Sequence, residues 1–410
     1  MKNRLLILLA LISNSVFAQE NRTEQWQNDI SYYHSELQKR HIDLYHKIDR
    51  ESFQNELNTI SASVEELTDW EIAVALMRLT RKIGDGHTSV SFMNWETNYF
   101  PVDVKKISGK WRVIRTTKEY AGILGATLEK IDGTDLSEIE ERLSEVAQFV
   151  ENEHSEVVRI GEYLPLSELL YALNITKKKD VADFQFVTDE GKKHKEKLNV
   201  VTKEALAELH YKTLTVGVPQ IVKPEKADFD YLWFTQVAGT QATYIRFDSY
   251  PKFEEMVPFA EKLVGFMMQN QSRQLIIDLR NNGGGDLYVG LVLANALNMV
   301  DGIDWKNGVY VLSGGVTFSA GASNVALFRE LLNATIVGTP TGSNPTGYQD
   351  MDAFNLPGSN LRITYSKRLF RIQEVPTEGV QPDIFLDYDW KSYAQGTDNM
   401  LEELLKKVNN

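Results

Sequence analysis

The stretch QLIIDLRNNGGGDLYVGLVLANAL, residues 274–297, decides the fold class. It begins with a short apolar run that is typical of a buried strand, and it ends in an apolar segment with the length of a helix. Three glycines at 283–285 mark the junction between the two. A strand joined to a helix by a Gly-rich turn is the first half of a βαβ unit.

The same alternation continues on both sides of this stretch. Strand-like runs lie at 242–249, 308–314 and 334–338, and helix-like segments lie at 253–269 and 320–332. This alternation predicts an α/β fold built on a parallel sheet covered by helices. Ligands of such sheets lie at the carboxyl ends of the strands, where the Gly-rich turn also falls.

The chain before this region has a different pattern. Apolar residues recur at helical spacing over 21–82, and Thr68 with Glu71 forms a capping box that predicts a helix start. Residues 100–201 mix short strands with a helix predicted at 136–150, and a charged connection with two prolines follows. We therefore expect a helical region and a mixed α+β module ahead of the parallel sheet.

The first residues, MKNRLLILLALISNSVFA, predict a signal peptide at 1–18. Two basic residues precede an apolar run, and Ala18 stands where a signal peptidase would cleave. The alternative is a membrane anchor, but the apolar run is shorter than the roughly 20 residues that span a bilayer. We expect an exported protein, periplasmic or extracellular, with no transmembrane segment after cleavage.

The bulk composition excludes several classes of protein. The 410 residues include no cysteine, which excludes disulfides, a thiol nucleophile and thiolate metal sites. The formal net charge is −13 at pH 7, so we expect no nucleic-acid partner. No HExxH or similar ligand spacing is present, and we expect no metal and no cofactor.

The Gly-rich turn at 283–285 allows three interpretations. Its amides could hold a phosphate, but no Gly-Lys-Ser/Thr sequence follows, which argues against a P-loop. They could instead stabilise an oxyanion, or the turn could bind nothing.

Ser319 stands at the corresponding place after the next strand, in GGVTFSAGASN, residues 314–324. It is either a helix N-cap or a nucleophile. A serine nucleophile needs a base, yet no histidine lies in the alternating region and no lysine lies between Lys306 and Lys367. Among the histidines, His87 is the best candidate because it lies in the Gly-punctuated loop GDGHT.

Six motifs occur in an order that resembles family S41, the carboxyl-terminal processing and tricorn-like serine peptidases. They are GDGHT, LGATLEKIDGTDL, LIIDLRNNGGGD, VTFSAGASN, ATIVGTPTG and TEGVQPDI. The resemblance implies a ClpP/crotonase-type peptidase core at 228–410 and a degenerate PDZ-like α+β module at 96–205. It also implies an N-terminal helical region at 19–95 and a linker at 206–227.

The resemblance assigns roles to individual residues. Ser319 falls on the nucleophile, and the amides of Gly284 and Ala320 fall on the oxyanion donors. The processing-protease branch has a lysine base where this chain has Asn344. The resemblance therefore favours the tricorn-like branch, in which a histidine activates the serine, and that histidine matches His87.

Two further positions complete the comparison with the tricorn-like branch. The serine that precedes the histidine there is replaced by Gly86. The acidic member, late in the core, matches either Glu378 or Glu374.

Together these inferences predict an exported serine endopeptidase that cleaves peptides or unfolded protein segments by a Ser-His-Glu mechanism. One alternative is a peptide-binding protein that kept the fold and lost activity, which the missing lysine would explain. A second alternative is an acyl esterase, because oxyanion donors serve any acyl transfer.

Overall fold

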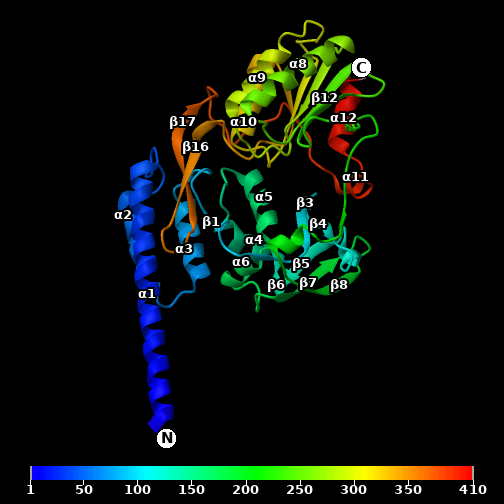
Figure 1. Cartoon of the computed structure of the whole chain (residues 1–410). Coiled ribbons are helices and arrows are strands. Elements are labelled where there is room, and N and C mark those ends of the chain that lie inside the picture. The colour runs from blue at the N-terminus through cyan, green and yellow to red at the C-terminus, as the bar shows by residue number, and fades with distance from the viewer. Residues whose placement is uncertain (1, 409–410) are drawn as a thin grey trace.

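The computed structural model describes residues 2–408, with side chains from residue 21 onward (Figure 1). The predicted signal peptide, 1–18, therefore lies outside the residues whose side chains are described. The backbone of residues 2–18 belongs to a long first helix, α1 (Lys2–Arg40). Within the described residues, no helix has both the length and the apolarity needed to cross a membrane.

The N-terminal region is helical, as predicted. Helices α2 (Arg50–Ala62) and α3 (Asp69–Arg81) follow α1. The predicted capping box at α3 is confirmed: the Glu71 N–H donates to Thr68 Oγ1 at 3.3 Å, and the Thr68 N–H donates to Glu71 Oε2 at 2.8 Å. Beside these helices lies a long hairpin from the other end of the chain, β16 (Thr346–Asn355) and β17 (Arg362–Arg371), with β1 (Ser89–Ser91) paired to β17 (Figure 1).

The middle of the chain forms the predicted mixture of strands and helices around a twisted sheet of order β10-β4-β5-β7-β8, with β3 on β4. The strands of this part are β2 (Asn98–Tyr99), β3 (Val102–Ile107), β4 (Lys110–Thr117), β5 (Thr127–Ile131), β6 (Thr134–Asp135), β7 (Val181–Val187), β8 (Lys193–Asn199), β9 (Val201–Thr202) and β10 (Tyr211–Thr213). Strand β6 pairs with β5, while β2 and β9 form a separate two-stranded sheet. Its helices are η1 (Ala121–Ile123), α4 (Leu136–Ser144), α5 (Glu153–Tyr163), α6 (Ser167–Ala172) and α7 (Lys203–Leu206).

Two details of this part differ from the sequence expectations. The helix predicted over 136–150 ends at Ser144, and the residues up to Asn152 form a loop that leads into α5. The segment expected to be a linker, 206–227, contributes β10, which pairs with Arg115–Thr117 of β4. Local sequence does not reveal the β10 pairing, because it depends on a strand that lies far away in the sequence.

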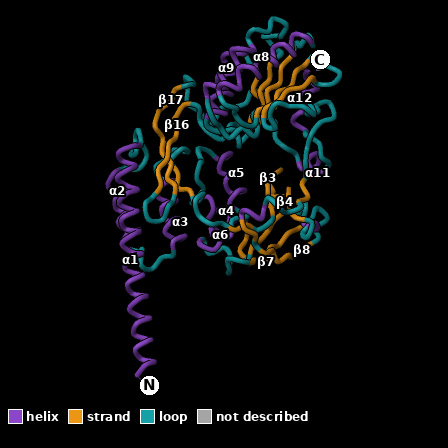
Figure 2. The backbone as a smooth tube through the Cα atoms, in the orientation of Figure 1, coloured by secondary structure: helices purple, strands orange, loops and turns teal. Residues whose placement is uncertain are grey.

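The last part contains the predicted α/β arrangement (Figure 2). Its sheet has the order β11-β12-β13-β14-β15-β18, and every pair is parallel except β11 with β12. The strands are β11 (Leu232–Gln236), β12 (Ala242–Phe247), β13 (Gln274–Asp278), β14 (Val309–Ser313), β15 (Thr335–Gly338) and β18 (Ile384–Phe385), and the helices are α8 (Phe253–Gln269), α9 (Leu287–Leu297), α10 (Ala320–Leu332), α11 (Trp390–Ala394) and α12 (Asn399–Val408).

The clusters of buried apolar side chains do not follow the three parts of the chain described above. One core cluster joins the N-terminal helices, the middle module and hairpin residues such as Phe354 and Ile363. Two other clusters cover the two faces of the parallel sheet, with α8, α9 and α10 on one face and α12 on the other. The hairpin therefore ties the last part of the chain to the first, beside the loop that follows α3.

Candidate active site

Ser319 lies in the turn after β14 and immediately precedes α10. Its backbone angles, φ 51° and ψ −126°, lie in a region that residues other than glycine rarely adopt. Its hydroxyl makes no capping hydrogen bond to α10, so the helix-cap interpretation does not hold. The Ser319 N–H instead donates to Ser343 Oγ at 2.7 Å, which holds the strained turn in place.

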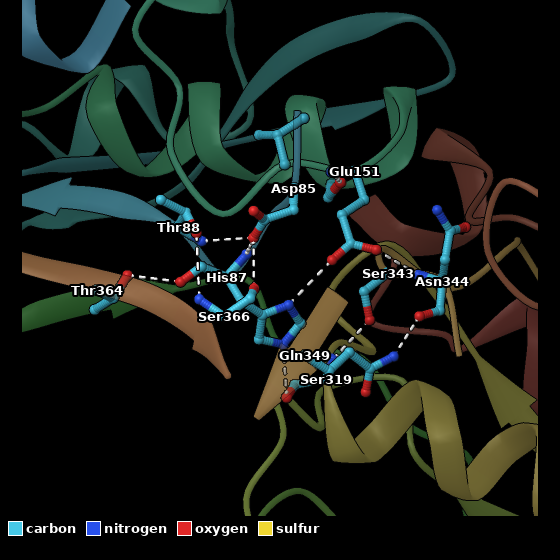
Figure 3. A network of polar contacts seen from close by, with 12 residues as sticks. Asp85, His87, Thr88, Glu151, Ser319, Ser343, Asn344, Gln349, Thr364 and Ser366 are labelled. Carbon is cyan, nitrogen blue, oxygen red and sulfur yellow. Dashed lines mark hydrogen bonds and ion pairs between the residues drawn. The ribbon is translucent and has the colours of Figure 1, made fainter. Parts of the chain in front are cut away.

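The loop after α3 brings His87 to this serine, across most of the sequence. His87 Nε2 lies 2.9 Å from Ser319 Oγ (Figure 3). The backbone of the loop is fixed against the hairpin, where Thr364 Oγ1 donates to the His87 carbonyl at 2.8 Å. The ring of Phe318 packs on the imidazole with the ring centroids 5.2 Å apart, and His87 is only 2% exposed.

The carboxylate beside His87 belongs to Glu151, in the loop between α4 and α5. Glu151 Oε1 lies 3.2 Å from His87 Nδ1, and their side chains are 8% and 2% exposed. An ionised carboxylate can only accept, so the proton of a neutral imidazole is held on Nδ1. Nε2 is then free to accept the proton of Ser319, which is the orientation a general base requires.

Glu151 is held from its other side by Asn344. The Asn344 N–H donates to Glu151 Oε2 at 2.7 Å, and the Asn344 side-chain oxygen accepts from the Gly379 N–H. Asn344, at the position where the resemblance would place the lysine of the processing proteases, thus supports the carboxylate through its backbone.

Gly86 leaves the space that Glu151 occupies. A Cβ atom built on Gly86 would lie 2.6 Å from Glu151 Cγ, 2.9 Å from Glu151 Oε1 and 2.9 Å from Phe318 Cζ. A serine here, as in the tricorn-like pattern, would collide with the carboxylate that contacts His87.

The structure does not bring the two glutamates chosen from the sequence to His87. Glu374 and Glu378 are both exposed in the loop after β17, and Glu151 takes the place next to the imidazole. Sequence reasoning missed Glu151, which directly follows the segment predicted to be helical over 136–150 and carries no motif of its own. The pattern Asn152 to Ser155, which caps α5, is the one local signal that the helix is interrupted there.

The Gly-rich turn lies directly against the serine. Gly284 has φ +109°, and a Cβ built on it would lie 2.7 Å from Ser319 Cβ and 3.4 Å from the Ala320 nitrogen. The Gly284 N–H donates to Asn282 Oδ1 at 3.0 Å, so it is not directed at the serine in this state. Ala320 is the first residue of α10, where the helix itself offers its amide no partner.

No family model matches the sequence, and no curated protein matches it either. Among solved structures, mature CPAF matches with a TM-score of 0.66 and 15% identity, covering 93% of this chain and 96% of that one. The chain has the fold of mature CPAF.

Two other structures extend the comparison. Mature CPAF complexed with lactacystin matches with a TM-score of 0.65 and 14% identity, covering 94% of this chain and 98% of that one. The photosystem II D1 C-terminal processing protease matches with a TM-score of 0.45 and 13% identity, covering 94% and 97%. The assignment of the fold rests on the two CPAF structures. These two matches cover 94% and 93% of the chain.

Proposed function

We propose that this chain is a serine endopeptidase that hydrolyses peptides or unfolded protein segments. One observation carries the proposal: a buried imidazole lies 2.9 Å from the hydroxyl of a serine in a strained turn, with a carboxylate on the other ring nitrogen. Three such groups in this order are the parts that activate a serine nucleophile. The S41-like motifs in the sequence support the same reaction.

In the proposed mechanism Ser319 Oγ attacks the scissile carbonyl carbon while His87 Nε2 accepts its proton. Glu151 keeps the Nδ1 proton in place and stabilises the imidazolium that forms. His87 then donates the proton to the leaving amine, and a water molecule activated by the same imidazole hydrolyses the acyl-enzyme. Apart from the substrate and this water molecule, all the groups in these steps are side chains of this chain.

The amides of Ala320 and Gly284 are the proposed donors to the oxyanion. Ala320 begins a helix, so the positive end of the helix dipole adds to its N–H. Gly284 would have to exchange the Asn282 side chain for the substrate oxygen. A peptide-binding protein without activity is the second candidate, because in this state the Gly284 amide is already paired.

The finer assignments are part of the same proposal. We assign the chain to the tricorn-like branch of family S41 because His87 and not a lysine faces the serine, with Asn344 at the lysine position. We keep the ClpP/crotonase-type core at 228–410 and the PDZ-like module at 96–205 as its parts. Export to the periplasm or beyond rests on the signal-like residues 1–18.

The proposal is tested by incubating the purified protein with an unfolded, fluorescently labelled polypeptide, alongside Ser319→Ala and His87→Ala. We expect cleavage by the wild type and none by either variant. Binding of the polypeptide without cleavage would favour the inactive binder. Hydrolysis of small esters but no peptide would favour an acyl esterase.

A further inference from the structure

A second buried carboxylate, Asp85, stands beside His87 and has no part in the proposed proton transfer (Figure 3). Its Oδ1 accepts the N–H of His87 at 2.9 Å and the N–H of Thr88 at 2.8 Å. The same oxygen accepts the hydroxyl of Ser366, on β17, at 2.7 Å. These contacts fix the backbone of the residue that supplies the imidazole.

His41, just after α1, contacts the other oxygen of Asp85. His41 Nε2 lies 2.8 Å from Asp85 Oδ2, and the two side chains are 0% and 3% exposed. His41 Nδ1 accepts the Asp43 N–H at 2.9 Å, so the proton of the neutral ring is on Nε2 and points at Asp85. Every oxygen of this buried carboxylate therefore has a donor.

These contacts keep Asp85 ionised. Burial alone would raise the pKa of Asp85, but the hydrogen bonds from His41 and Ser366 outweigh burial and lower the pKa to about 2. A permanent negative charge thus lies within the loop that carries His87. Buried charges of opposite sign favour each other strongly, because little water screens them.

Several polar or ionisable groups face His87 and His41 from the surrounding elements. On the imidazole of His87 they are Glu151 from the α4–α5 loop and Ser319 from the start of α10. On the side of His41 they are His46, with ring centroids 6.2 Å apart, and Tyr348 of β16 at 6.1 Å. The carboxylate of Asp43 lies next to them and accepts the Tyr348 hydroxyl at 2.9 Å.

From this arrangement we propose that Asp85 is a positioning residue for His87 and that His41 anchors it. The inference rests on the proposed function of Ser319 and His87. Asp85 fixes the loop so that the imidazole spans Glu151 and Ser319, and its charge stabilises the imidazolium formed during catalysis. His41 links this loop to the end of α1, so the N-terminal helices take part in organising the site.

The test compares Asp85→Asn with Asp29→Asn, a matched control. Asp29 on α1 is also fully buried, and it accepts two backbone N–H groups, from Gly358 at 2.7 Å and Ser359 at 2.6 Å. It has no contact with His87. We expect Asp85→Asn to lower the second-order rate of labelling by a fluorophosphonate about 10- to 100-fold, and Asp29→Asn to change it less than about threefold.

The pH profile of labelling separates a positioning role from a merely structural one. The Asp85→Asn variant removes a negative charge near the imidazolium, so the acid limb of the profile should move to lower pH by roughly 0.5 unit. A uniform loss of rate at every pH, or an equal loss in Asp29→Asn, would overturn the inference. Labelling of wild type that survives Ser319→Ala would instead overturn the proposed function.

A second pair of variants keeps the inference testable if Asp85→Asn fails to fold. The side-chain amide of His41→Gln can still donate to Asp85, whereas His41→Ala cannot. We expect His41→Gln to retain most of the labelling rate and His41→Ala to lose about tenfold. Equal rates in the two variants would contradict the anchoring role of His41.

Discussion

Glu151→Gln is the substitution that most sharply separates this site from the one the sequence suggested. Glu151 uses both of its oxygens: Oε1 faces His87 Nδ1 at 3.2 Å, and Oε2 accepts the Asn344 N–H at 2.7 Å. A glutamine has one acceptor oxygen in place of two. If the oxygen stays on Asn344, the amide NH₂ faces His87 and forces its proton onto Nε2, which then cannot accept from Ser319.

The other orientation of the glutamine is also unfavourable. With its oxygen on His87, the NH₂ group would face the Asn344 N–H, and two donors would meet in a site where the side chains are 8% exposed or less. An unpaired buried donor costs about 1–3 kcal/mol. The first orientation therefore dominates, and a triad with the wrong tautomer loses on the order of 10³- to 10⁴-fold in rate.

The assay is the rate of fluorophosphonate labelling and of polypeptide cleavage, with Glu374→Gln and Glu378→Gln as matched controls. Both control glutamates are exposed in the loop after β17, and each control removes one charge. We expect a loss of about 10³-fold or more for Glu151→Gln and less than about twofold for the controls. A large loss in Glu378→Gln with normal labelling in Glu151→Gln would refute the role given to Glu151.

Two further predictions concern Gly86 and Lys105. Gly86→Ser should lower the labelling rate about 100-fold, because its Cβ would stand 2.6 Å from Glu151 Cγ and displace the carboxylate, while Gly122→Ser, where a Cβ meets nothing within 4 Å, should have little effect. Equal rates for these two variants would contradict the packing argument. Lys105 has its pKa lowered to about 8, by burial first and then by the charge of Arg280. Between that value and the unfolded pKa of about 10.4 only the unfolded chain holds the proton, so stability should rise with pH in this window. Thermal unfolding should show this rise in wild type and in Lys106→Met but not in Lys105→Met, and the same rise in Lys105→Met would contradict it.

The parallel sheet and two of the three residues of the proposed triad could be predicted from the sequence for a physical reason. Strand and helix periodicities are local, and the glycines at 283–285 mark where one gives way to the other. The predicted strands and helices of the last part occur as β12 to β15 and α8 to α10. Ser319 and His87 were candidates because they stand in small-residue turns, and their 2.9 Å contact brings them together.

Glu151 could not be found in the same way. Its contact with His87 depends on how α3, α4 and α5 pack, and no local pattern in 136–150 shows that α4 stops at Ser144. The resemblance to family S41 indicates a glutamate late in the chain. Glu151 fits beside the imidazole because Gly86 has no side chain to fill that space. The pairing of the Gly284 amide with Asn282 is likewise a tertiary detail, since it depends on the side-chain rotamer inside the turn.

The central claim is that His87 activates Ser319, and mass spectrometry of the labelled protein tests it most directly. The wild type is treated with a fluorophosphonate, digested, and the modified residue is mapped. We predict a single adduct on Ser319 that His87→Ala suppresses by at least about 10³-fold. An adduct on another residue, or an unchanged yield on Ser319 in His87→Ala, would contradict the account.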